Sequence, residues 1–156
     1  MKLTLAAHGR IRSGPERELV DDYLARATAT GRSIGLGPAA ELEIDNRALK
    51  TKTDESRALA QALPPGAVLV LLDERGKALT SRALADQIGR WRDDGRREAV
   101  FCIGGADGHD RSVLPQPDLT LAFGPAVWPH KLIRIMLAEQ LYRASAILAG
   151  TPYHRD

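Results

Sequence analysis

Short apolar runs alternate along the chain with segments that repeat their apolar residues every three or four positions. The runs predict buried strands at residues 3–7, 67–72, 99–103 and 119–123, and a weaker edge strand at residues 42–44. The run at 67–72 is apolar on both faces, which is typical of a parallel sheet covered on two sides. The alternation predicts an α/β fold, a mainly parallel sheet covered by helices, in one domain over residues 1–156.

Helical periodicity marks the segments between the strands. Pro15 opens the first helix, Thr53 is expected to cap the second, and Thr80 or Ser81 is expected to cap the third. Residues 73–78 are polar and contain a glycine, so we expect a turn that leaves the preceding strand.

The last helix is predicted over residues 130–149, with Pro129 in its first turn. Its apolar residues follow spacings of three and four, as one buried face requires. Ile135 and Met136 widen that face beyond what a single sheet needs. We therefore expect this helix to pack against a partner subunit as well.

The composition suits a protein with one core and no covalent cross-links. The chain has 156 residues, of which 44% are apolar, and its single cysteine, Cys102, lies within an apolar run. We expect a buried, inert thiol, and neither a disulfide nor a cysteine-ligated zinc. No apolar run approaches the roughly 20 residues of a membrane span, and Met1 leads directly into a strand without a signal peptide. A cytoplasmic protein without structural metal is predicted.

Charge and aromatic content limit how the chain could bind nucleic acid. The formal net charge is only +2, from 22 basic and 20 acidic residues, and aromatic residues make up 4%. A protein that binds naked RNA unaided usually shows a strong basic excess, and base stacking needs aromatic side chains. A nucleic-acid role would therefore depend on a local basic patch or on a large substrate that supplies shape.

Three loops follow the three strongest strands: the polar segment after Leu72, the glycine-rich residues 104–108, and residues 123–129. Ligands bind at the carboxyl ends of strands in open α/β sheets, and glycine lets a ligand approach the backbone closely. A tight strand-to-helix connection would explain the glycines equally well. The sequence contains no phosphate-loop motif, no strict dinucleotide fingerprint and no recognisable hydrolase motif. An adenosine-like ligand without a triphosphate fits better than a nucleoside triphosphate.

Polar residues of the last helix offer candidate chemistry. His130 begins the helix, where the dipole favours a neutral imidazole that could accept a proton or simply cap the helix. Arg134, one turn later on the same side, would point to a phosphate or to solvent. Glu139 and Arg143 are expected to form a surface ion pair. His8, after the first strand, is expected to be structural.

Five motifs stand in order along the sequence: LLDERGK at 71–77, IGGADG at 103–108, PHKLIR at 129–134, EQLYRA at 139–144 and PYHR at 152–155. Together they resemble the bacterial RlmH family, the large-subunit rRNA pseudouridine N3-methyltransferases of the SPOUT class. The resemblance covers the whole chain. The sequence departs from the family pattern at His8, where an aliphatic residue is expected, and in the glycine-rich residues 31–37.

The resemblance implies a C-terminal trefoil knot, which general topology would disfavour because knotted chains are rare. It also implies a homodimer. S-adenosylmethionine would lie in the knot, in contact with Leu72, Gly104 or Gly105, and Phe123, Gly124, Pro125, Ala126, Val127 and Trp128. The substrate would be N3 of the pseudouridine at position 1915, in helix 69 of 23S rRNA within the assembled ribosome. Such a large substrate would explain the small net charge.

The implied reaction needs no metal, because the sulfonium methyl of that cofactor is already activated. The N3–H group of a uracil ring is a weak acid, so His154 or His130 is expected to accept or relay its proton. Arg155 and Arg134 would stabilise the developing anion or clamp a phosphate. The tail with His154 would act across the dimer, since it follows the helix expected at the interface, although four terminal residues can also be a solvated end.

Two alternatives stay open. One is a knotted methyltransferase that acts on tRNA or on a ribose hydroxyl, but such enzymes tend to carry an extra RNA-binding domain or a more basic surface. The other is a non-enzymatic ribosome-binding module that uses the loops only structurally. Stoichiometric binding of S-adenosylmethionine would count against the module.

Overall fold

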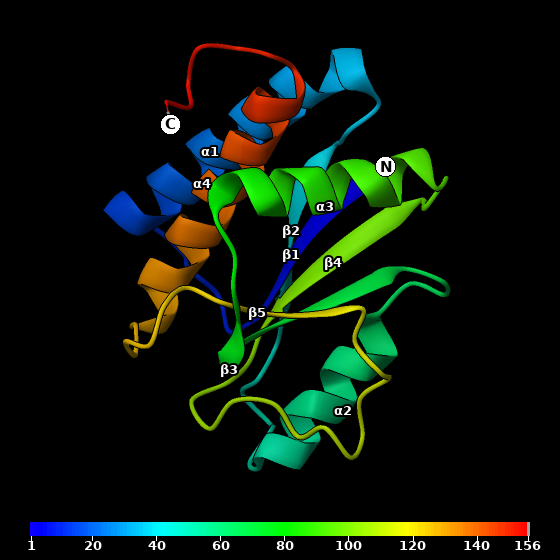
Figure 1. Cartoon of the computed structure of the whole chain (residues 1–156). Helices are drawn as coiled ribbons and strands as arrows, with labels where there is room; N and C mark the ends of the chain where they lie inside the picture. The colour runs from blue at the N-terminus through cyan, green and yellow to red at the C-terminus, as the bar shows by residue number, and fades with distance from the viewer. Residues whose placement is uncertain (156) are drawn as a thin grey trace.

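A computed structural model describes residues 1–155 of the chain; Asp156 of the tail lies outside the described residues. Its sheet has the strand order β2-β1-β4-β3-β5, and every neighbouring pair is parallel (Figure 1). The strands are β1 Lys2–His8, β2 Ala39–Ile44, β3 Val68–Ala78, β4 Glu98–Ile103 and β5 Leu119–Ala122. The predicted parallel α/β fold is confirmed, and β2 is an edge strand as expected.

Helices cover both faces of the sheet (Figure 1). They are α1 Pro15–Gly31, α2 Lys52–Ala62, α3 Ser81–Asp93 and α4 His130–Leu148, with a short 3-10 helix, η1, at Arg32–Ile34. The helices α1, α3 and α4 lie on one face and α2 lies on the other. None of the described helices is both long enough and apolar enough to cross a membrane.

Alternate residues of the strands fill two apolar layers. Phe101 and Leu5 face the larger layer, where they join Leu137 of α4. Cys102 faces the smaller layer under α2, beside Leu59. Burying each large apolar side chain stabilises the fold by about 1.5–3 kcal/mol, so the three-helix side carries most of the hydrophobic stabilisation.

The caps of the helices differ in part from the prediction. The hydroxyl of Thr51, not Thr53, caps α2 by accepting a hydrogen bond from the Asp54 amide at 3.1 Å. Thr53 lies inside the first turn, and its hydroxyl instead donates to Asp110 at 2.6 Å. Thr80 caps α3 by accepting from the Ala83 amide at 3.1 Å, which resolves the choice between Thr80 and Ser81.

The prediction of a turn over residues 73–78 is wrong, because β3 continues to Ala78. Leu72 and Lys77 both pair with Leu121 of β5, so the residues between them are extruded as a bulge. Gly76 allows the bulge to pack closely on β5, because a Cβ at this residue would lie 2.8 Å from backbone atoms of β5. The polar composition that suggested a turn is the composition of the bulge.

Candidate functional site

A cavity of about 320 Å³ opens beside the bulge of β3 and the carboxyl ends of β4 and β5. The first turn of α4 and the loop before it form the opposite wall. Apolar side chains such as Ile103, Leu121 and Ile133 line it together with the bare backbone of the glycine-rich turn 104–108. This size and mixture are those of a small-molecule site.

The cavity brings together most residues that the sequence proposed for cofactor contact. Its wall contains Leu72, Gly104, Gly105, Phe123, Gly124, Ala126, Val127 and Trp128. Pro125 is not part of the wall. The indole Nε1–H of Trp128 donates to the Phe123 carbonyl at 3.1 Å, which ties the two ends of the loop together.

The polar segment after Leu72 lines this cavity, as the sequence indicated, but it does so as a bulge within β3 and not as a loop that ends the strand. Asp73, Glu74 and Arg75 line the cavity because the bulge turns them out of the sheet. Arg75 hydrogen-bonds to the Asp73 carboxylate at 3.1 Å and thereby lowers its pKa, so Asp73 presents a negative charge. The polar composition after a buried strand indicated a ligand-binding segment correctly, and only its expected conformation, a turn, was wrong.

Close packing accounts for two of the glycines at this site. A Cβ on Gly104 would lie 2.8 Å from the backbone carbon of Gly108, because the turn folds back on itself. A Cβ on Gly105 would lie 1.8 Å from the Oε2 atom of Glu55, so the α2 carboxylate sits directly over this peptide. Gly104 therefore serves a tight turn and Gly105 a close contact with α2, but the segment leads to β5 and not to a helix as the strand-to-helix alternative assumed. The same backbone also forms part of the cavity wall.

The four residues proposed for catalysis do not meet within one chain. His130 lines the cavity, whereas the tail lies at the other end of α4 (Figure 1). The Nδ1 atom of His154 is 3.2 Å from Arg143, which lies about 20 Å along the helix axis from His130 at 1.5 Å per residue. A site that used both histidines would need tails and cavities from different chains.

The described part of the tail packs against α4 rather than extending freely. The Tyr153 ring packs against Tyr142 at a tilt of 49° with centroids 4.4 Å apart, and its hydroxyl donates to Glu139 at 3.0 Å. Arg143 pairs with the same carboxylate at 2.6 Å, so the predicted ion pair is confirmed, though it is half-buried rather than a surface pair. Burial and the bond to Glu139 raise the pKa of Tyr153 to about 12, so its phenol remains a donor.

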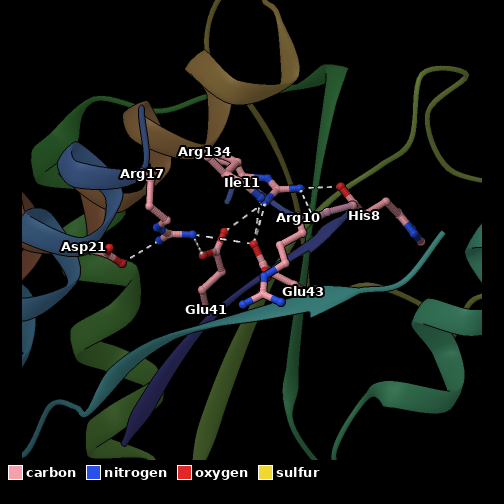
Figure 2. Close-up of polar contacts among 9 residues, drawn as sticks. His8, Arg10, Ile11, Arg17, Asp21, Glu41, Glu43 and Arg134 are labelled. Atoms are coloured by element: carbon pink, nitrogen blue, oxygen red, sulfur yellow. Dashed lines mark hydrogen bonds and ion pairs between the residues drawn. The ribbon is translucent and has the colours of Figure 1, made fainter. Parts of the chain in front are cut away.

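Arg134 points inward, not to a phosphate or to solvent as the sequence suggested. Arg134 is only 4% exposed. Figure 2 shows its guanidinium directed at the loop after β1 and at the acidic residues of β2. Nη1 lies 3.2 Å from Glu41, and Nη2 donates to the backbone carbonyls of His8 and Gly9. The spacing that placed Arg134 beside His130 was right, but its partners are far away in sequence.

Two histidines and the cysteine lie close to the strand ends. Cys102 is fully buried as predicted, and burial raises the pKa of its thiol to about 12. His109 is buried with its Nε2 3.2 Å from the Cys102 carbonyl, and burial lowers its pKa. Burial also lowers the pKa of His8, whose charge environment includes Glu55 and His130. Both imidazoles are therefore favoured in their neutral form.

Comparison with known proteins assigns this arrangement to a family. A family model described as "Predicted SPOUT methyltransferase" matches residues 1–154. The chain is 78% identical to the ribosomal RNA large subunit methyltransferase H of Maricaulis maris. The two sequences align over the full length of both proteins. It is 55% and 52% identical, over 99% of each chain, to the proteins of the same name from Dinoroseobacter shibae and Ruegeria pomeroyi. The chain belongs to the RlmH family of SPOUT methyltransferases.

Membership in the RlmH family makes the chain a methyltransferase, which needs a cavity for a methyl donor beside the acceptor atom. The cavity described above combines apolar side chains with the backbone of the glycine-rich turn 104–108. His130 places a titratable ring at its edge. Across residues 1–155, no three or more His, Cys, Asp or Glu side chains are grouped to hold a metal ion.

Proposed function

We propose that the chain uses S-adenosylmethionine to methylate N3 of the pseudouridine at position 1915, in helix 69 of 23S rRNA, within the assembled ribosome in the cytoplasm. The relatives' shared name, ribosomal RNA large subunit methyltransferase H, supports the substrate class. The cavity at the strand ends is the observation that carries the cofactor assignment, because eight of the proposed contact residues line it together. The implied trefoil knot and the single domain over residues 1–156 belong to the same proposal.

The cavity fits this cofactor chemically. Leu72, Ile103 and Leu121 give an apolar slot for an adenine ring. Gly104 and Gly105 add backbone without side chains to the cavity wall, so a ligand can approach it closely. When bound, S-adenosylmethionine supplies an electrophilic methyl group, so the chain itself has to orient the base and take one proton from it.

The histidines carry the proton transfer in this proposal. The imidazole of His130 lies at the cavity edge, where a ring nitrogen can accept the N3 proton or pass it to water. The side chains of His154 and Arg155 would complete the site from the tail of the other subunit. Arg155 is exposed and would stabilise the anion that forms on the base. Arg134 has no direct role here, since its guanidinium is buried among protein groups.

The surface supports a homodimer. Ile135 and Met136 of α4, the residues that widen its apolar face, line a second hollow of about 440 Å³ beside Leu79. Leu19 of α1 and Leu132 of α4 are exposed large apolar side chains on the adjacent helices. Neighbouring exposed apolar residues of this kind mark association surfaces. A second copy would cover them and bring its tail toward the cavity.

The substrate is tested by transfer of a labelled methyl group from S-adenosylmethionine to assembled ribosomes that lack the modification, to isolated large subunits and to bulk tRNA. We expect label in assembled ribosomes, at N3 of the helix 69 pseudouridine, as mapped by mass spectrometry. Label in tRNA with none in ribosomes would overturn the substrate assignment. Failure of calorimetry to detect S-adenosylmethionine binding would overturn the cofactor assignment.

Sharing of the site between subunits is tested by mixing two inactive variants, His130→Ala and His154→Ala. After subunit exchange, half of the dimers are mixed, and each mixed dimer has one site with both histidines if the tail acts across the interface. Roughly a quarter of wild-type activity is therefore expected. If activity stays at the level of the separate variants while exchange is complete, the tail does not act across the dimer.

A further inference from the structure

Arg134 is a buried cation whose position in the fold links the cavity to the opposite edge of the sheet. Arg134 lies one turn after His130 on α4, and only 4% of it is exposed. Arginine is almost never this buried unless its guanidinium is fully paired. The identity of its partners therefore indicates what the residue does.

The guanidinium divides its contacts between side chains and backbone (Figure 2). Nη1 lies 3.2 Å from Glu41 Oε1 and 3.6 Å from Glu43 Oε1, both on β2. Nη2 donates to the carbonyl oxygen of His8 and, at 2.8 Å, to that of Gly9. The two carboxylates neutralise the charge, and the two carbonyls tie the end of β1 to the first turns of α4.

The peptide that Arg134 holds is also fixed from its other side. The Gly9 amide donates to the Ile44 carbonyl at 2.9 Å, and the Ile11 amide donates to Glu43 at 3.0 Å. Arg134 and β2 thus enclose the start of the loop after β1. In Figure 2 the His8 side chain leaves this peptide on the side away from Arg134. The contacts made to this backbone therefore fix the point from which the His8 side chain extends.

Arg17 provides an internal comparison within the same network. Its Nη1 lies 2.5 Å from Glu41 and 3.6 Å from Glu43, and its Nη2 lies 2.8 Å from Asp21. Within residues 1–155, Arg17 shares both carboxylates with Arg134 but makes no hydrogen bond to the His8 or Gly9 carbonyl. A change at Arg17 therefore disturbs the ion pairs without releasing the backbone.

We propose that Arg134 is a positioning residue for methyl transfer: it fixes the first turn of α4, which carries His130, against the His8–Gly9 peptide at the end of β1. Glu41 and Glu43 hold the guanidinium in the orientation that reaches both carbonyls. The inference rests on the proposed function insofar as it assigns His130 to the reaction. It replaces the direct catalytic role that the sequence suggested for Arg134.

Lysine at this position tests the geometry without leaving a buried charge uncompensated on the carboxylates. An ammonium group keeps the charge, but it cannot present the planar fork that contacts Glu41 and two carbonyls together. Arg134→Lys should therefore lower kcat about tenfold or more, because misplacing a reacting group by about 1 Å can cost a factor of 10². The dissociation constant of S-adenosylmethionine should change less than about twofold, since most residues that line the cavity belong to β3, β5 and the loops after β4 and β5 rather than to α4.

Arg17→Lys is the matched control. It should lower the thermal midpoint by an amount similar to Arg134→Lys, yet leave kcat close to wild type when both are assayed well below unfolding. If the two variants lose kcat equally, or if Arg134→Lys keeps full kcat, the positioning role is excluded. A loss of folding in Arg134→Lys would shift the test to Glu41→Gln, which loosens the same guanidinium and should lower kcat in the same way.

A second readout does not depend on activity and separates this inference from the proposed function. The imidazole C–H signals of His8 and His130, assigned by substitution, should shift in the NMR spectrum of Arg134→Lys and stay near wild-type positions in Arg17→Lys. This comparison remains decisive if wild-type protein fails to methylate ribosomes. Unchanged imidazole signals in Arg134→Lys would overturn the inference even if the proposed reaction were correct.

Discussion

Gly76, in the β3 bulge, offers a sharp test of the cavity architecture. A Cβ at this residue would lie 2.8 Å from the carbonyl carbons of Thr120 and Leu121 and from the Thr120 oxygen. Ordinary van der Waals contacts of a Cβ begin at 3.4 Å, so β5 and the bulge would have to separate by about 0.6 Å. All three atoms belong to the backbone, and no side-chain rotation can relieve the contact.

Gly76→Ala should therefore destabilise the fold by about 1–3 kcal/mol, the usual cost of overpacking a well-filled interior. For a chain of this length, each kcal/mol lowers the thermal midpoint by about 2–4 °C, which gives a decrease of roughly 2–12 °C. The same displacement moves Asp73 and Leu121, which line the cavity. S-adenosylmethionine should therefore bind more weakly. Its dissociation constant should rise about tenfold for each 1.4 kcal/mol of binding free energy that is lost.

Thermal unfolding followed by circular dichroism, with and without S-adenosylmethionine, measures both effects. Gly89→Ala in α3 is the matched control, because its Cβ would meet only the tip of the Leu148 side chain, at 3.1 Å. Helix propensity favours alanine over glycine there by about 1 kcal/mol, so the control should unfold at or above the wild-type temperature. If Gly76→Ala unfolded within about 1 °C of wild type and bound the cofactor normally, the inference that Gly76 is required for the close packing of the β3 bulge on β5 would be refuted.

Three other predictions concern Cys102, His109 and Trp128, which lie at or near the cavity or the strand ends. Burial raises the pKa of Cys102 to about 12, so a disulfide reagent at pH 8 should modify this thiol only after denaturant is added. Burial lowers the pKa of His109, so the unfolded chain binds a proton at a higher pH than the folded chain does. The free energy of unfolding in urea should therefore fall as the pH drops below about 6.5. His109→Leu should reduce this dependence of stability on pH. An unchanged slope would contradict this. Trp128→Phe removes the hydrogen bond to the Phe123 carbonyl and should weaken S-adenosylmethionine binding severalfold in calorimetry, with little change in thermal midpoint.

The sequence predicted the fold well where a single physical rule dominates. Apolar runs such as residues 99–103 form buried parallel strands, and Pro15 begins α1 as expected. The rule failed at residues 73–78, where polar side chains suggested that the strand had ended. Strand continuation there depends on pairing with Leu121, a long-range contact that local composition does not encode.

The candidate site divides in the same way. Loops at the carboxyl ends of strands were expected to converge, and they do form one cavity. The orientation of Arg134 was not predictable from helix spacing, because Glu41 and His8 lie 93 and 126 positions away in the chain. His130 and the tail are separated because they lie at opposite ends of α4, which spans 19 residues.

The acidic residues of β2 also protect the sheet at its boundary. An edge strand exposes unpaired amide and carbonyl groups that can recruit a strand from another molecule. Glu41 and Glu43 project from the same side of β2, and Arg17 and Arg134 hold them in place. An incoming strand would have to accommodate these fixed charges beside its own side chains. The same ion pairs that anchor the loop after β1 therefore oppose aggregation through the edge of the sheet.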